Sequence, residues 1–144
     1  MSIPADFRRV IEADDPDWAP GLPTHARLIY GDHLKNRLEV VTLRGFNKLM
    51  QTSAAMEPGE KQRWFNQYMI VQSEPLKIDK DGRIILSQRL REKLDVIEGD
   101  LMLRGTVDQF EIWNADAYRA KYSRASEEFL ADKGEDFDPR TLAL

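Results

Sequence analysis

The sequence contains no cysteine and only two histidines among its 144 residues. The absence of cysteine excludes disulfides, thiolate metal sites and a cysteine nucleophile, and it fits a reducing compartment. His25 and His33 do not have the His-x-x-x-His spacing of a metal site. Gly-x-Ser-x-Gly, Walker and Gly-x-Gly-x-x-Gly motifs are absent as well. We therefore predict no enzyme activity, no cofactor, no metal and no small-molecule substrate.

Long apolar runs are missing too. No stretch approaches the roughly 20 apolar residues that a membrane helix needs, and residues 1–10 lack the apolar centre of a signal peptide. We therefore expect a cytoplasmic protein without a membrane partner. The length fits one compact unit or two very small ones, and the hydrophobic content of 42% is enough for a core. The net charge of −4 gives no overall attraction to nucleic acid, so any such binding needs a local basic patch.

Residues 77–93 form such a patch, with six basic side chains against three acidic ones. A two-stranded ribbon of this sign can enter the DNA major groove, where arginine reads guanine and lysine binds phosphate. The residues alone leave three interpretations open: a nucleic-acid-binding surface, a protein-interaction surface, or a solvated edge. Residues 124–144 have the opposite balance, with six acidic and three basic side chains, and they are predicted to be a solvated helix end that becomes disordered.

The second half has the clearest secondary-structure signals. We predict a strand at 75–78, a turn at 79–82 in which Gly82 supplies a positive φ, and a returning strand at 83–86. Ser87 is predicted to cap a short helix. A Glu-Gly-Asp turn at 98–100 leads into the next strand, and a further strand covers 109–113. Asn114 is predicted to cap a helix at 115–132.

The first half has a similar series of signals. We predict a helix from about Ala5, a proline-rich loop at 14–24, and strands at 26–31 and 37–42. Thr42 is predicted to cap a helix at 43–56. A second helix at 59–71 has an aromatic stripe with helical spacing, which is typical of core. The stripe consists of Trp64, Phe65, Tyr68 and Met69.

The two halves therefore form an internal repeat. Residues 2–8 align with 85–91, residues 38–42 with 110–114, and Phe46 with Tyr118. Between these anchors the first copy is longer by eleven residues, which the proline-rich loop accounts for. We predict an α+β fold in which two small β-rich units pack around a pseudo-two-fold axis, each completing the other's sheet.

The sequence also resembles a known family. Residues 79–91, Asp-Lys-Asp-Gly-Arg-Ile-Ile-Leu-Ser-Gln-Arg-Leu-Arg, followed by Phe-Glu-Ile-Trp at 110–113, are similar to the second half of MraZ, a family of bacterial transcriptional regulators. Residues 2–9 resemble the segment after the family's first Asp-x-x-x-Arg motif, and the likeness covers about residues 2–125. It implies tandem AbrB-like (SpoVT-AbrB) swapped-hairpin units, a closed ring of subunits, and binding to short direct repeats upstream of the chain's own operon in the division and cell-wall gene cluster. It also implies a nucleoid location.

The resemblance divides the chain into four parts. We expect a first SpoVT-AbrB-like unit at 1–55, a connecting helix at 56–73, a second unit at 74–122 and a helical acidic tail at 123–144. An antitoxin-like module that binds another protein is the alternative function, because the AbrB-like fold also serves toxin–antitoxin pairs.

The family's Asp-x-x-x-Arg motif, which has a DNA-contacting and a structural role, matches Asp79 and Arg83. We expect Asp79 and Gly82 to shape the turn. The candidate DNA-binding residues are Arg8, Arg9, Lys77, Lys80, Arg83, Arg89 and Arg91. Ser87 stands where the family often has proline, and its capping ability should preserve the helix start.

The first copy lacks a counterpart of the hairpin at 75–86, since Met1 falls in the middle of the expected strand. Either the hairpin has been lost or Met1 is an internal start, and we favour the internal start. On this interpretation Ile3 has no partner strand and leaves a sheet edge exposed. A form extended upstream should then bind promoter DNA more tightly and melt at a higher temperature.

Overall fold

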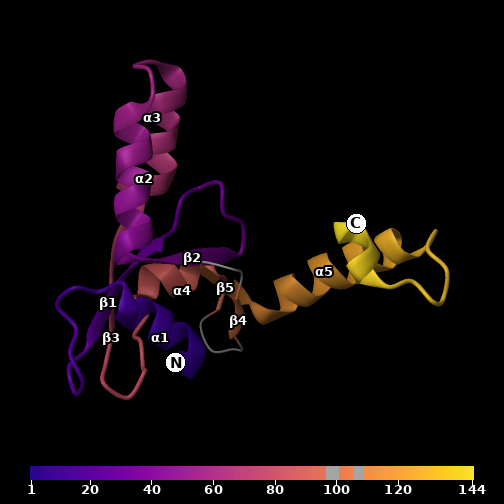
Figure 1. Ribbon diagram of the computed structural model, residues 1–144, viewed down its shortest axis with the longest axis horizontal. Helices are drawn as coiled ribbons and strands as arrows, with labels where there is room; N and C mark the ends of the chain where they lie inside the picture. The colour runs from indigo at the N-terminus through magenta and orange to yellow at the C-terminus, as the bar shows by residue number, and fades with distance from the viewer. Residues whose placement is uncertain (97–100, 106–108) are drawn as a thin grey trace.

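The computed structural model describes residues 1–96, 101–105 and 109–144 (Figure 1). Within these residues the centre is a five-stranded sheet with strand order β3-β1-β2-β5-β4, in which all neighbouring strands are antiparallel. The strands are β1 (Thr24–Ile29), β2 (Arg37–Thr42), β3 (Ser73–Ile78), β4 (Leu101–Gly105) and β5 (Phe110–Asn114). The predicted α+β class is confirmed.

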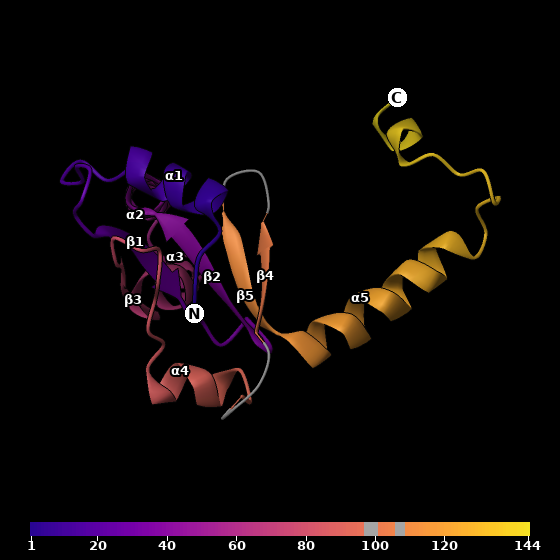
Figure 2. The ribbon, with the colours of Figure 1, turned by 90° about the horizontal axis from the view of Figure 1, so that it is seen from below.

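Helices flank the sheet and extend beyond it. They are α1 (Ala5–Ala13), α2 (Leu43–Ala55), α3 (Glu60–Asn66), the π-helix η1 (Gln67–Val71), α4 (Gln88–Lys93), α5 (Ala115–Leu130) and the 3-10 helix η2 (Pro139–Ala143). The α2–α3 hairpin projects from one side of the sheet, whereas α5 leaves β5 and carries the C-terminus away from the body (Figures 1 and 2). The molecule therefore has a compact centre with two projecting arms.

Three predicted helix starts are confirmed. The side chains of Thr42, Ser87 and Asn114 accept hydrogen bonds from the backbone N–H groups of Gly45, Leu90 and Ala117, respectively. Each bond satisfies one of the N–H groups that the first helical turn leaves without a partner. The starts of α2, α4 and α5 are thus determined by local chemistry.

The order helix–strand–strand–helix occurs twice, as α1-β1-β2-α2 and as α4-β4-β5-α5. β2 pairs with β5 at the centre, where Glu39 lies opposite Glu111. These two residues are counterparts in the alignment of the two halves. β3 precedes α4 in the chain but pairs with β1, so a strand of the second half extends the sheet beside the first half. The assignment of each half to the AbrB-like class stays a prediction.

The main core lies on the side of the sheet where α1 and α4 pack. Leu28, Leu38 and Ile112 of the sheet are fully buried there. The helices and the segments before them add residues that are counterparts in the two halves. Ile3, the partly buried Phe7 and Ile11 of the first half correspond to Leu86, Leu90 and Leu94 of the second. A smaller cluster of Ile29, Leu34, Val41 and Phe46 is covered by Leu49, Met69 and Ile70.

The N-terminal segment differs from what the sequence predicts. The Ile3 N–H donates to the Gly82 carbonyl at 2.7 Å, and the Ile84 N–H donates to the Met1 carbonyl at 2.8 Å. Ile3 is only 4% exposed. The prediction that Ile3 has no partner was therefore wrong, because residues 1–3 run antiparallel beside residues 82–84.

Two further predictions need correction. Residues 83–86 do not form a full strand: Arg83 makes an isolated bridge to Ser2, and the chain then runs extended into α4. The aromatic stripe is not wholly core, because Trp64 is 51% exposed while Met69 packs against the smaller cluster. The predicted Glu-Gly-Asp turn at 98–100 lies outside the described residues.

Candidate nucleic-acid interface

The turn after β3 is organised by one carboxylate. The Asp79 Oδ1 atom accepts the backbone N–H groups of Asp81 and Arg83 at 2.9 and 2.8 Å. The Asp79 backbone also accepts from Gly82 N–H and donates to the Arg83 carbonyl, both at 2.9 Å. The N–H of Arg83 is the main cause that lowers the pKa of Asp79 below its ordinary value of 3.8. Asp79 therefore remains ionised at neutral pH, and its side chain and backbone both hold the turn together.

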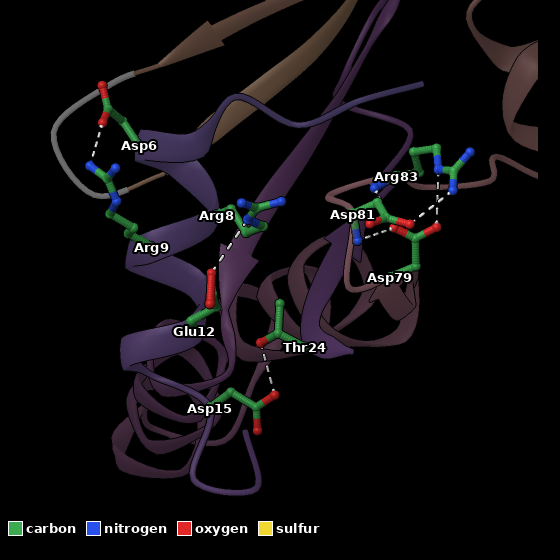
Figure 3. A network of polar contacts seen from close by, with 9 residues as sticks. All are labelled: Asp6, Arg8, Arg9, Glu12, Asp15, Thr24, Asp79, Asp81 and Arg83. Carbon is green, nitrogen blue, oxygen red and sulfur yellow. Dashed lines mark hydrogen bonds and ion pairs between the residues drawn. The ribbon is translucent and has the colours of Figure 1, made fainter. Parts of the chain in front are cut away.

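The Arg83 side chain is oriented by the same turn. Its Nε lies 3.3 Å from Asp79 Oδ2, and its Nη2 lies 3.0 Å from Asp81 Oδ2 (Figure 3). The side chain nevertheless stays 62% exposed. Because a planar guanidinium offers five donors in a fixed arrangement, two carboxylates on one side hold the group without covering it. Arg83 is thus both a structural and a surface residue.

Gly82 allows α1 to approach the turn closely. Its φ of +79° is unfavourable for residues with a side chain, and a Cβ at this position would lie 2.6 Å from Arg8 Nη1. Arg8 points from α1 toward the turn and also pairs with Glu12 at 3.5 Å (Figure 3). The structure therefore brings Arg8, from the first half, beside the Asp-x-x-x-Arg motif of the second half.

Two predicted lysines lie at or near this turn. Lys80 is exposed at its tip and, together with Arg8 and Trp18, lines a cavity of about 240 Å³. Lys77 is exposed on β3, where it pairs in register with His25 of β1. We call Arg8, Lys77, Lys80 and Arg83 the turn cluster.

The other predicted basic residues lie elsewhere. Arg9 points away from the turn and pairs with Asp6 at 3.1 Å (Figure 3). On α4, Arg89 pairs with Glu74 at 2.7 Å, and Arg91 donates to the Leu86 carbonyl. Glu74 is five residues before Asp79 on an extended strand, which corresponds to about 16 Å. The structure therefore separates Arg9, Arg89 and Arg91 from the turn cluster.

An apolar residue near the turn was missed. Ile85 is 88% exposed, whereas its neighbours Ile84 and Leu86 are buried. Successive side chains of an extended segment point to opposite sides, so this alternation could have been recognised in the Ile-Ile-Leu run. An exposed isoleucine two residues after Arg83 places an apolar side chain beside the charged turn.

Metal sites and membrane-spanning helices were considered only for the part of the chain that the structure describes. In that part, no group of three or more His, Asp or Glu side chains is arranged to hold a metal ion. Among the same residues, no helix has the length and apolar character to cross a membrane.

Comparisons with known proteins identify the family. A family model described as "MraZ protein, putative antitoxin-like" matches residues 69–140. A protein of Ruegeria pomeroyi named "Transcriptional regulator MraZ" is 37% identical over 140 residues, covering 96% of this chain and 83% of that protein. A protein of the same name from Cereibacter sphaeroides is 34% identical over 143 residues, covering 94% and 83%. One from Acidithiobacillus ferrooxidans is 38% identical over 69 residues, covering 48% and 42%. The chain therefore belongs to the MraZ family of transcriptional regulators.

Proposed function

We propose that this chain is a sequence-specific DNA-binding regulator that uses the turn cluster to contact DNA. It binds short direct repeats in the promoter of its own operon, within the division and cell-wall gene cluster. It acts in the cytoplasm at the nucleoid, as a ring of identical subunits built from two SpoVT-AbrB-like units each. The observation that supports this most strongly is a preorganised, exposed arginine at a protruding turn in a family of transcriptional regulators.

The environment of Arg83 favours base reading over simple phosphate attraction. Asp79 and Asp81 hold the guanidinium in one orientation, so less side-chain entropy is lost when it binds a guanine edge. The same carboxylates repel phosphate. Lys80 at the tip and Lys77 on β3 are better placed for phosphate contacts, which position a protein on DNA without reading sequence. Arg8 supports the turn from α1 and adds positive charge.

The test is Arg83→Ala with a fragment of the chain's own promoter. Losing a base contact should weaken binding by about 1–3 kcal/mol and reduce discrimination at one base position. Lys80→Ala should instead weaken binding evenly across DNA sequences. It should also reduce, by about one, the slope of the logarithm of the binding constant against the logarithm of the salt concentration. Arg140→Ala is the matched control, because this exposed arginine pairs with Asp138 in the C-terminal tail. Unchanged DNA affinity in a folded Arg83→Ala protein would remove the turn from the interface.

The acidic tail supports a second candidate, an antitoxin-like module that binds another protein. Residues 123–136 are exposed throughout, and residues 124–144 have six acidic and three basic side chains. The salt dependence of DNA binding separates the two candidates. A protein that neutralises phosphates loses affinity steeply as salt rises, whereas a module without an operator shows no specific complex to weaken.

A further inference from the structure

The α2–α3 hairpin contains an open pocket with aromatic walls. Its volume is about 580 Å³, within the range in which protein pockets hold compact apolar groups. Tyr68 lies between two other rings, with centroids 5.5 Å from Trp64 and 5.4 Å from His33. Met56, Phe65 and Met69 complete the apolar lining. Since Trp64 is 51% exposed, the pocket presents unsatisfied apolar surface to its surroundings.

The apolar stripe of α5 continues beyond the body of the protein. Tyr118 and Tyr122 pack against Trp113, with ring centroids 5.5 and 5.8 Å away. Ala125 and Phe129 follow with the alternating three- and four-residue spacing that keeps side chains on one face of a helix. From Ser123 to the end of α5 every residue is exposed. The helix therefore has an apolar face whose second part is largely exposed, although the Phe129 ring also contacts the Phe137 ring, with centroids 5.9 Å apart, and the Lys133 Nζ atom at 5.1 Å.

Two large side chains stand at the end of this helix. Phe129 is 47% exposed and Leu130 is 46% exposed. The pocket and this helix end lie on separate arms of the molecule (Figures 1 and 2). The helix end is therefore placed to reach a pocket on another molecule.

The two surfaces also have opposite charge. Residues 43–71, which form the α2–α3 hairpin and η1, have four basic and two acidic side chains. Residues 124–144 have three basic and six acidic side chains. The pocket lining itself has one residue of each sign, Glu60 and Lys61, so the difference in charge lies in the wider surfaces. Glu127 and Glu128 directly precede Phe129. Complementary charge at an interface favours association of the correct partners.

We propose that residues 123–130 of α5 dock onto the α2–α3 pocket of a second copy of this chain, with Phe129 and Leu130 as the inserted side chains. The contact uses different surfaces on the two molecules, so repeating it produces a closed ring when the rotation closes. The inference rests on the self-assembly in the proposed function, and it names the surfaces that perform it.

Mixing two variants tests the docking. Trp64→Glu blocks the pocket and leaves the tail intact, while Phe129→Glu blocks the tail and leaves the pocket intact. In light scattering the wild type should have a mass several times 16.7 kDa, and each variant alone should have the mass of a monomer. Their equimolar mixture should reach the mass of a dimer and no more, because one intact contact remains. Leu142→Glu is the matched control, since Leu142 is an apolar residue that is 62% exposed but lies outside α5. This variant should assemble to the same mass as the wild type.

Disulfide trapping gives a second readout, because the chain has no cysteine of its own. Trp64→Cys and Phe129→Cys proteins should form a covalent dimer when they are mixed and oxidised, and neither should do so alone. A wild-type monomer, a Phe129→Glu protein with wild-type mass, or a disulfide between two copies of Phe129→Cys would each overturn the docking.

DNA binding distinguishes this inference from the proposed function. A fragment with one repeat needs only the turn cluster, so Phe129→Glu should bind it as the wild type does. A fragment with several repeats should be bound less tightly by this variant, because linked contacts are lost. If Arg83→Ala leaves every DNA affinity unchanged, the proposed function fails while the assembly result stands.

Discussion

Two glutamates that face each other across β2 and β5 have very different environments. Glu111 is 7% exposed, and its carboxylate lies 2.9 Å from Arg104 Nη1 and 3.4 Å from Arg37 Nε. The ionised form of Glu39 is less well stabilised by its surroundings. Burial raises its pKa above the ordinary value of 4.5, the nearby Glu111 raises it further, and Arg37 only partly opposes the change. The negative charge therefore stabilises the fold at Glu111 and destabilises it at Glu39, although the two positions are equivalent in the two halves.

We predict that the same substitution has opposite effects at these two positions. Glu39→Gln should increase the free energy of unfolding at pH 7 by less than about 1 kcal/mol, because partial exposure screens the effect. Glu111→Gln should decrease it by about 1–3 kcal/mol, since two arginines lose a charged partner. Urea unfolding of both variants measures the difference. A loss of stability in Glu39→Gln would contradict the environment described.

The pH dependence of Glu39→Gln is set by the direction of the shift. A raised pKa means that the folded protein holds the proton more tightly than the unfolded chain, so ionisation of Glu39 weakens the fold. The advantage of the glutamine variant should therefore be full at neutral pH. It should shrink as the pH falls through the raised pKa and disappear below 4.5.

The start of α4 can be compared with that of α1, because Ser87 and Pro4 are counterparts in the two halves. Both have similar backbone angles, with φ −61° and ψ 157° at Ser87 and φ −54° and ψ 145° at Pro4. Only Ser87 has a side-chain cap, which accepts from the Leu90 N–H at 3.4 Å. The two helices thus begin with the same geometry, stabilised in different ways.

Substitutions at Ser87 test this comparison. Ser87→Ala should lower the free energy of unfolding by about 0.5–1 kcal/mol through loss of the cap. Ser87→Pro should change it by less than about 0.5 kcal/mol, because the native φ already suits proline and the unfolded chain loses freedom. Thermal melts of the two variants measure these effects. A proline variant less stable than the alanine variant would show that the geometry of Pro4 does not transfer.

Local signals in the sequence predicted elements well and pairing poorly. The cap at Ser87 and the turn at Gly82 depend on residues only a few positions apart, so they could be recognised in advance. The contact of Ile3 with Gly82 joins residues far apart in the chain, and no local pattern indicates it. The same holds for the site: the Asp79–Arg83 turn was predictable, but the position of Arg89 depends on Glu74, fifteen residues earlier. Exposure of Trp64 depends on what packs against α3, which helical periodicity does not specify.

At the scale of the whole molecule, acid stability depends on carboxylates with lowered pKa values. Asp15 is 6% exposed and accepts from the Thr24 hydroxyl and the His25 N–H at 2.9 Å each, and from the Asp17 N–H at 3.0 Å. Burial raises the pKa of Asp15, but these three hydrogen bonds outweigh it and bring the pKa below the ordinary 3.8. The pKa values of the partly exposed Asp79 and Asp138 are lowered too.

We predict that Asp15→Ala lowers the free energy of unfolding at pH 7 by about 2–3 kcal/mol, because three donors lose a charged acceptor. A lowered pKa gives stability that is present above the unfolded value and is lost as the pH falls through the folded one. The difference between wild type and variant should thus be constant above pH 3.8, apart from the tail of the titration, and shrink below it. Asp17→Ala is the control and should change stability by less than about 0.5 kcal/mol. Denaturant unfolding at pH values above and below 3.8 measures these differences. Equal changes in the free energy of unfolding for Asp15→Ala and Asp17→Ala would contradict the role given to Asp15.

The strand order also determines how long each strand remains without its partner while the chain is being translated. β1 ends at Ile29 but its partner β3 begins at Ser73, and β2 ends at Thr42 but its partner β5 begins at Phe110. At the usual 5–20 residues per second, the edge of β2 waits roughly 3–14 s for β5. Until β3 is made, the β1–β2 hairpin has two free edges, and from then until β5 is made the edge of β2 stays free. A free edge can pair with a neighbouring nascent chain. The speed of translation between the halves therefore influences whether the sheet is completed within one chain or between two.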